Sequence, residues 1–466
     1  MPNVDAAFVT NKAVGKYLSR GAEPEARMVL GQQPRAWERV VVLPCKDEDP
    51  TRVSRLRGWL ADAAPECLLL VVSNGPAGSP RSPQAEALRK LVRPDPTLPA
   101  ENMGWLDGDG CDALWVERCG VAAGIPSAQG VGRARKLGGD IALALWSRGA
   151  IRSPWIHYTD ADATPSSCIA QMERFCDVVA VVWPFRHLAC GDEELRRGHL
   201  KHEIWMRWWV RGLEYAGSPF AYHTIGSCMS VTMEGYAHVR GIPARAAGED
   251  FHALCKLAKI GTVARGEGEL VCIESRGSSR VPFGTGPAVA RMRAQPETWR
   301  LSRPEVFEHL RQWLRVMRRI VNHDEDPWAP AGRDRGVVES AVAETMGAGW
   351  MEQLLKDNRG AGSLLRAHQW FDALKTLRFV HALERKSSLG PIAALEHLEE
   401  ASGTTSPLLE AWCDSLRASE RSFATGVGRA RMIAPHDDHA EVDVCRWMHS
   451  PARDIERADA VIADEA

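Results

Sequence analysis

The stretch "WIHYTDADATPSS", residues 155–167, is the part of the sequence on which the predicted fold and the predicted site both depend. Its apolar beginning predicts a buried strand, and Asp160 and Asp162 follow at the strand's C-terminal end. Thr164 and Pro165 fit the cap and first turn of a helix. Local features leave two interpretations open: a divalent-metal site, or an ordinary polar turn that ends a strand.

Outward from this stretch, strands alternate with helices. Alternation of this kind predicts an α/β domain with a mostly parallel sheet flanked by helices. Polar residues follow several strands, where ligands gather in such sheets. The other predicted strands are "RVVVL" before Pro44, "CLLLVV" before Ser73 and "DVVAVVWPF", and the predicted helices cover residues 53–64 and 130–149.

The pattern of apolar residues changes near residue 291, where amphipathic helical spacing replaces strand-like runs. We therefore expect three parts: an N-terminal extension (1–37), an α/β domain (38–290), and a C-terminal helical region with a short disordered tail (291–466). The helical region is expected to bind the acceptor, a partner or a second copy of the chain, and these alternatives, including a homo-oligomer, stay open.

Composition narrows the class of protein. The 466 residues carry a net charge of −2, so no basic field favours nucleic-acid binding. The apolar runs are too short for a transmembrane helix, and the N-terminus has no apolar core of secretory length. Twelve scattered cysteines without a C-x-x-C pair are expected to be buried free thiols. These features predict a cytoplasmic protein.

The D-x-D pattern occurs four times, so context has to separate a site from a turn. The pair at 107–109 alternates with glycine and predicts a turn, and the pair at 324–326 predicts a solvated linker. The pair at 47–49 precedes Pro50 and is typical of a helix start. The pair at 160–162 follows a strand, and two carboxylates with phosphate oxygens are the usual protein contribution to a Mg²⁺ site.

Three further segments are candidates for chemistry. Glu249 and Asp250 begin an amphipathic helix, either as complements to the helix dipole or as a general base at a rigid position. The basic cluster "RARK" at 133–136 is either a solvated helix turn or a diphosphate site. Arg276 and Arg280 lie in a serine- and glycine-rich loop from which they would close over phosphates.

Taken in order, these segments resemble the inverting, family-2 glycosyltransferases with the GT-A fold. The family's opening strand and Asn-Glu-like turn are similar to "LPCKDED", with Glu48 matching and Asp47 in place of asparagine. Its nucleotide-contacting acidic pair is similar to "VVSNG", where Ser73 and Asn74 replace the acids. The family's "ARN-x-G" resembles "ARKLG", its metal-binding D-x-D resembles "TDADA", and its catalytic acidic pair resembles "GED". The resemblance covers roughly residues 38–290.

The resemblance implies a hexosyltransferase-type enzyme that binds a nucleotide-sugar donor and Mg²⁺ or Mn²⁺. Asp162 would ligate the metal with Asp160, and Asp250, beside Glu249, would take the proton from an acceptor hydroxyl. Two rivals stay open: a sugar-phosphate nucleotidyltransferase and a non-catalytic nucleotide-sugar-binding protein. The residues that would bind the donor are Pro44, Lys46, Glu48, Asn74, Arg135, Asp160, Arg276 and Arg280.

Overall fold

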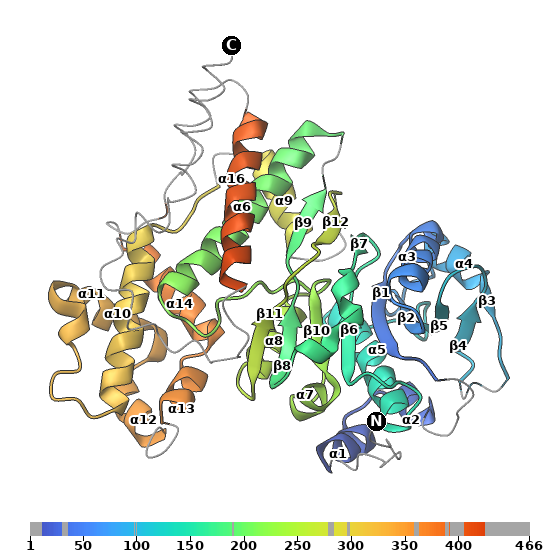
Figure 1. The fold of residues 1–466 in the computed structure, drawn as a ribbon, viewed down its shortest axis with the longest axis horizontal. Coiled ribbons are helices and arrows are strands. Elements are labelled where there is room, and N and C mark those ends of the chain that lie inside the picture. Colours follow the sequence, from blue (N-terminus) through green and yellow to red (C-terminus); the bar gives the residue numbers. More distant parts are fainter. Residues whose placement is uncertain are drawn as a thin grey trace. The chain divides into compact units, whose positions relative to one another are not determined.

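The computed structural model describes residues 12–29, 36–188 without 97 and 99, 191–277, 284–295, 299–357, 363–386, 391 and 405–424. The chain forms two compact units (Figure 1). The first comprises Met1–Cys190 and Thr224–Ala288, and the second comprises Gly191–His223 and Val289–Ala466. The sequence predicted an α/β part followed by a helical part. The observed units differ because the internal segment Gly191–His223 belongs to the helical unit.

The first unit contains two sheets. Nine strands form the large sheet in the order β11-β8-β10-β6-β1-β2-β5-β4-β3, and β7-β12-β9 form a small one. The strands are β1 (Arg39–Cys45), β2 (Cys67–Asn74), β3 (Val92–Arg93), β4 (Met103–Leu106), β5 (Asp112–Arg118), β6 (Trp155–Tyr158), β7 (Ala163–Thr164), β8 (Val178–Val182), β9 (Phe185–Leu188), β10 (Met229–Thr232), β11 (Thr262–Arg265) and β12 (Val271–Glu274).

The large sheet is mixed, so the prediction of a mostly parallel sheet is wrong. The central strands β6, β1, β2 and β5 are parallel neighbours, and β8 runs parallel to β11. In contrast, β10 runs antiparallel to β6 and β8, and β4 runs antiparallel to β3 and β5. Crossover helices permit parallel pairing at the centre, whereas the short connection between β4 and β5 imposes antiparallel pairing.

The two central strands are buried on both faces. Residues of β1 and β2 are almost all inaccessible to solvent, which explains why they read as continuous apolar runs. Pro44 does not end β1 as the sequence suggested, because the strand continues to Cys45. Pairing with β6 stops at Val42, so Pro44 lies beyond the pairing on that side. The carboxyl end of β1 therefore includes Pro44 and Cys45, and the strand ends closer to Glu48 than the sequence suggested.

Helices cover the sheet of the first unit. Helix α5 packs against β1, β2 and β6, and Gly138 permits the close approach because a Cβ there would lie 2.3 Å from the Val42 side chain. The helices are α1 (Lys12–Arg20), α2 (Pro24–Val29), α3 (Pro50–Ala63), α4 (Pro83–Arg89), α5 (Gly130–Ser147), α7 (Met233–His238) and α8 (Glu249–Leu257), with 3₁₀ turns η1 (Ser167–Ala170) and η2 (Met172–Arg174).

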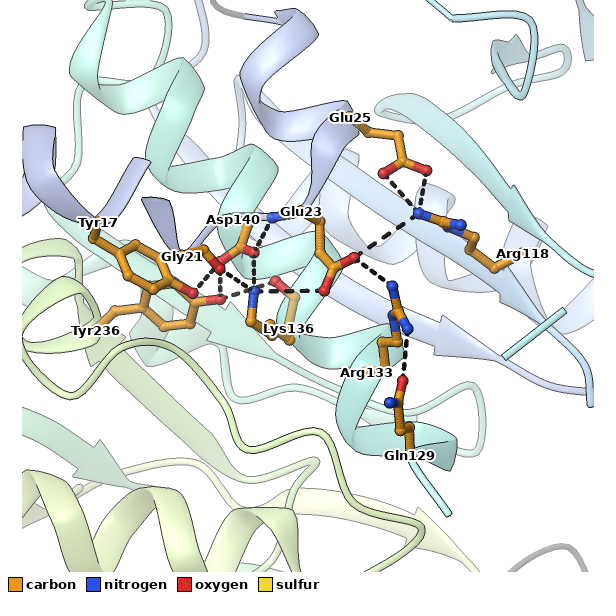
Figure 2. Close-up of polar contacts among 10 residues, drawn as sticks. All are labelled: Tyr17, Gly21, Glu23, Glu25, Arg118, Gln129, Arg133, Lys136, Asp140 and Tyr236. Carbon is orange, nitrogen blue, oxygen red and sulfur yellow. Dashed lines mark hydrogen bonds and ion pairs between the residues drawn. The ribbon is translucent and has the colours of Figure 1, made fainter. Parts of the chain in front are cut away.

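The N-terminal helices are joined to this unit by buried polar contacts (Figure 2). The Asp140 carboxylate of α5 accepts hydrogen bonds from the Tyr17 and Tyr236 hydroxyls, each at 2.7 Å. It also accepts from the Lys136 ammonium at 2.6 Å and from the Glu23 backbone N–H at 2.8 Å. Residues 12–29, expected as part of a separate extension, thus pack on α5 and α7 of the first unit.

The second unit is helical, as expected for the C-terminal part. Its described elements are α6 (Glu193–Tyr215), α10 (Pro304–Val321), η4 (Ala329–Asp334), α11 (Arg335–Met346), α12 (Trp350–Asp357), α13 (Ser363–Trp370), α14 (Ala373–Glu384) and α16 (Thr405–Ala424). Helix α9 (Thr285–Ala294) contains the boundary between the units. Trp313 of α10 is fully buried and packs edge-on against Trp350 and Phe371. Helix α6 joins this unit because it packs against α10 and α16.

Candidate active site

Three of the four D-x-D pairs are turns or caps. The Asp49 carboxylate caps α3 by accepting hydrogen bonds from the backbone and side chain of Thr51. The pair at 107–109 is exposed in the turn between β4 and β5. The Asp326 carboxylate accepts from the Trp328 backbone N–H at 3.2 Å. Asp49 and Asp326 therefore have local structural roles, and the pair at 107–109 lies in an exposed connection, as the sequence context indicated.

The fourth pair follows β6 at its carboxyl end. A tight turn holds it, because the Ala163 N–H donates to the Asp160 carbonyl at 3.0 Å. Both aspartates are partly exposed. The expected helix cap at Thr164 is wrong: Thr164 ends the short strand β7, and Ser166 caps η1 instead. Pairing of β7 with β12 explains the difference, since it draws the chain into the small sheet.

Arg135 links the D-x-D segment to the start of α8. Its buried guanidinium donates from Nη2 to Asp160 Oδ1 at 2.6 Å and from Nη1 to Glu249 Oε1. The guanidinium packs against Gly226, where a Cβ would lie 2.5 Å from Arg135 Cζ. One arginine thus joins two acidic segments that are far apart in the sequence.

The remaining basic residues of the "RARK" cluster have other partners (Figure 2). Arg133 contacts Glu23 at 3.0 Å and Gln129 at 2.6 Å, and Lys136 contacts Asp140. Residues 133 and 136 share one face of α5, whereas residue 135 lies on another face. Of this cluster, only Arg135 therefore contacts the D-x-D segment and the start of α8, and its diphosphate role stays a prediction.

Asp250 has an unusual environment at the beginning of α8. Gly248 precedes the helix in a left-handed conformation with φ of 69°, which orients the two acids that follow. Glu249 is buried in its ion pair with Arg135, while Asp250 stays partly exposed. Burial and the neighbouring Glu249 raise the pKa of Asp250 to about 7, against the lowering effect of Arg135. Such a carboxyl exchanges its proton near neutral pH.

A second arginine closes the other side of the D-x-D turn. The Arg276 guanidinium donates from Nε to Asp162 Oδ2 at 2.6 Å. Its two terminal nitrogens form a fork with Glu48, at 2.9 Å and 2.6 Å. Glu48 itself is only 5% exposed and lies three residues beyond the end of β1. Asp160 and Asp162 are therefore each paired with a different arginine. Arg280 lies outside the described residues.

The carboxyl end of β2 carries an unpaired amide. Asn74 is only 5% exposed, and its Oδ1 has no hydrogen-bond partner among the described residues. Burial of an unpaired carbonyl oxygen is unfavourable, so this atom is suited to a ligand donor. Pro44 is buried at the end of neighbouring β1, and Lys46 follows it, partly exposed. The neighbouring strand ends thus bring these sequence-derived candidates to one edge of the sheet.

The charge of the cluster suits a cation. Five carboxylates, those of Glu48, Asp160, Asp162, Glu249 and Asp250, are paired with or close to two guanidinium groups. Among the described residues no three His, Cys, Asp or Glu side chains form a ready metal cage. Mg²⁺ and Mn²⁺ need no such cage, because one or two carboxylates suffice when phosphates and water complete the shell. The donor set therefore fits a hard divalent cation.

Sequence reasoning missed one strand at this edge. Glu117, the residue before the last of strand β5, is 7% exposed and forms an ion pair with Arg81. The sequence did not predict the strand "DALWVER", because the residues before it are rich in glycine and aspartate and are typical of a loop. Its apolar run ending in a charged pair was the available signal. Arg276 was expected to contact phosphates, but its contacts with Glu48 and Asp162 had no signal in the sequence.

Fold and site define a mixed α/β protein with an ion-paired acidic cluster at the carboxyl edge of its central strands. In comparisons with known proteins, the chain matches no protein-family model and no curated protein. Within the described ranges, no helix is both long enough and apolar enough to span a membrane. The expectation of a cytoplasmic protein stays a prediction.

Proposed function

We propose that the protein is an inverting glycosyltransferase of the GT-A type, which moves a sugar from a nucleoside-diphosphate donor to an acceptor hydroxyl. The observation that carries the proposal is the double ion pair of Arg135 with Asp160 and Glu249. It supports the proposal because it unites the D-x-D turn with the acidic helix start. Asp250 then lies beside the carboxyl ends of the strands, where α/β proteins bind ligands.

Donor binding is assigned to the edge formed by β1 and β2. Asn74 Oδ1 would accept a hydrogen bond from an N–H on the edge of the nucleobase, which would satisfy its buried oxygen. Arg276, together with Lys46 at the end of β1, would offset the charge of the diphosphate. Of these residues, Asn74 is the last residue of β2 and Lys46 follows the last residue of β1.

Asp162, with Asp160, would hold a divalent metal at this site. Mg²⁺ or Mn²⁺ there supplies charge neutralisation to the diphosphate leaving group. Lys46 and Arg276 are the candidates to offset the negative charge of the diphosphate that the metal leaves unneutralised. Asp250 would remove the proton of the acceptor hydroxyl, and its pKa of about 7 suits a general base that works near neutral pH. Glu249 is committed to Arg135, so its role is to position that arginine.

The test begins with donor identification and continues with Asp250→Asn. A panel of nucleotide sugars with Mn²⁺ is scored by thermal shift, because a bound donor raises the apparent melting temperature. The variant is expected to keep the metal-dependent shift and to lose transfer by about 10²–10⁴-fold. The matched control is Asp109→Asn in the exposed turn, which should transfer at the normal rate.

Three outcomes would contradict the proposal or its parts. Normal transfer by Asp250→Asn would refute the assignment of the base. Release of pyrophosphate in place of a nucleoside diphosphate would favour a nucleotidyltransferase. A panel in which no nucleotide sugar shifts the melting temperature would refute donor binding altogether.

A further inference from the structure

Arg276 is bonded to Asp162, the carboxylate that is proposed to hold the metal. All three guanidinium nitrogens are used on two carboxylates, Nε on Asp162 and the terminal pair on Glu48. A planar guanidinium matches carboxylates in this forked geometry. The positive group therefore neutralises part of the acidic cluster.

The backbone before Arg276 is fixed on two sides. The Glu274 N–H donates to the Asp162 carbonyl at 2.8 Å, and the Glu274 carboxylate pairs with Arg52 and Arg55 of α3. Ser275 donates its hydroxyl to the Leu188 carbonyl at 2.6 Å. These contacts hold the backbone before Arg276 without using its guanidinium.

A guanidinium and a divalent cation compete for the same carboxylate. Two positive charges a few ångströms apart repel each other strongly in a partly buried site. Phosphate oxygens offer the guanidinium an equivalent forked partner. A donor diphosphate would therefore replace Asp162 as the hydrogen-bond partner of the Arg276 guanidinium.

We propose that Arg276 is a resident cation that covers Asp162 in the ligand-free protein and moves to the donor diphosphate when the divalent metal binds. The inference rests on the proposed function for the identity of the diphosphate. It implies that metal and donor each strengthen the binding of the other, since linkage is reciprocal. The free protein is then a weak metal binder in spite of its five clustered carboxylates.

The experiment measures Mn²⁺ binding alone, by the loss of the free-ion electron paramagnetic resonance signal, without donor or acceptor. Arg276→Gln removes the competing charge, so it is expected to bind Mn²⁺ at least about tenfold more tightly than the unmodified chain. Adding Asp162→Asn to this variant should cancel the gain. The matched control is Arg55→Gln, whose partner is Glu274 and whose effect should stay below about twofold because exposed charges are screened.

Unchanged or weaker Mn²⁺ binding in Arg276→Gln would overturn the proposal, as would a gain that survives Asp162→Asn. If loss of the fork leaves Glu48 unpaired and the variant fails to fold, the double variant Arg276→Gln with Glu48→Gln replaces it. This variant removes the competing charge and leaves no carboxylate without its partner, so Mn²⁺ binding tighter than in Glu48→Gln alone is expected, and an unchanged affinity again overturns the proposal. Since no donor is used, a failure here is distinguishable from a failure of glycosyl transfer.

Discussion

At the scale of single residues, Asp250 is the group whose protonation matters most. Its pKa of about 7 results from burial and from Glu249, and a general base acts only when it is unprotonated. We therefore predict that the transfer rate is lost as pH falls through about 7, by roughly tenfold per unit below it. The pH profile of kcat/KM for the donor identified above checks this. A flat profile between about pH 5.5 and 8 would contradict it.

Arg135 is the residue on which the stability of the site depends. Replacing it with glutamine would leave Glu249 buried and unpaired, and breaking a buried pair in this way costs about 3–5 kcal/mol. We predict a loss of this size in the unfolding free energy of Arg135→Gln, measured by urea denaturation. The double variant with Glu249→Gln should recover most of the loss, because no buried charge is then left alone. If Arg135→Gln and the double variant were equally unstable, the loss would come from the packing of Arg135 against Gly226 and not from the unpaired charge of Glu249.

At the scale of elements, α5 has two functions on two faces. One face presents Arg135 to the acidic cluster, and another holds the N-terminal helices through Asp140 (Figure 2). The Asp140 carboxylate is fully buried, and its hydrogen bonds come from Tyr17, Tyr236, Lys136 and the Glu23 backbone. Helix α1 thus contributes to the surroundings of the helix that carries Arg135.

Tyr17→Phe tests this connection. The change removes one hydrogen bond to a buried carboxylate and is expected to cost about 1.5–3 kcal/mol of local stability. Amide hydrogen exchange should become faster in residues 12–29 and stay unchanged in β1 and β2. Lys12→Met is the control, because Lys12 is exposed on the same helix. Equal acceleration in the sheet would show that the N-terminal helices unfold only with the whole unit.

At the scale of the whole molecule, each unit contains a buried histidine that is kept neutral. Burial lowers the pKa of His157 in the first unit to about 3 and that of His368 in the second to about 4. In the unfolded chain both groups take up protons below about pH 6.5. A depressed histidine pKa therefore leaves stability unchanged above that pH and reduces it as pH falls toward the folded pKa.

We predict that each unit loses about 1.4 kcal/mol per pH unit from its histidine between about pH 6 and 4. In the first unit, His157→Asn should flatten this slope, because asparagine can keep the hydrogen bond with Ser230 without the imidazole. Urea unfolding at a series of pH values gives the measurement. His238→Asn, at an exposed position, should leave the slope as it is. An unchanged slope in His157→Asn would assign the acid sensitivity to other groups.

The sequence by itself determined the parts whose signals are local. Continuous apolar runs identified β1, β2, β6 and β8 because buried strands have few polar residues, and helical spacing identified α5 and α10. Polar residues at the strand ends pointed to the sheet edge that carries Asp160, Asp162 and Asn74. The helix start expected after the acids at 47–49 is confirmed, since α3 begins at Pro50 and Asp49 is its N-cap. Each of these features depends on neighbours within a few positions along the chain.

Tertiary structure decided what these residues contact. Strand direction followed from the connections between strands, so the sheet is mixed and β5 ends beside β2. The faces of α5 separated Arg135 from Arg133 and Lys136. Arg276 meets Glu48 across 228 positions of sequence. Ion pairs of this kind arise from strand order and register, and no local pattern of residues encodes them. The sequence thus located the acidic edge, and only the fold showed which arginine pairs with Glu48, Asp160, Asp162 and Glu249.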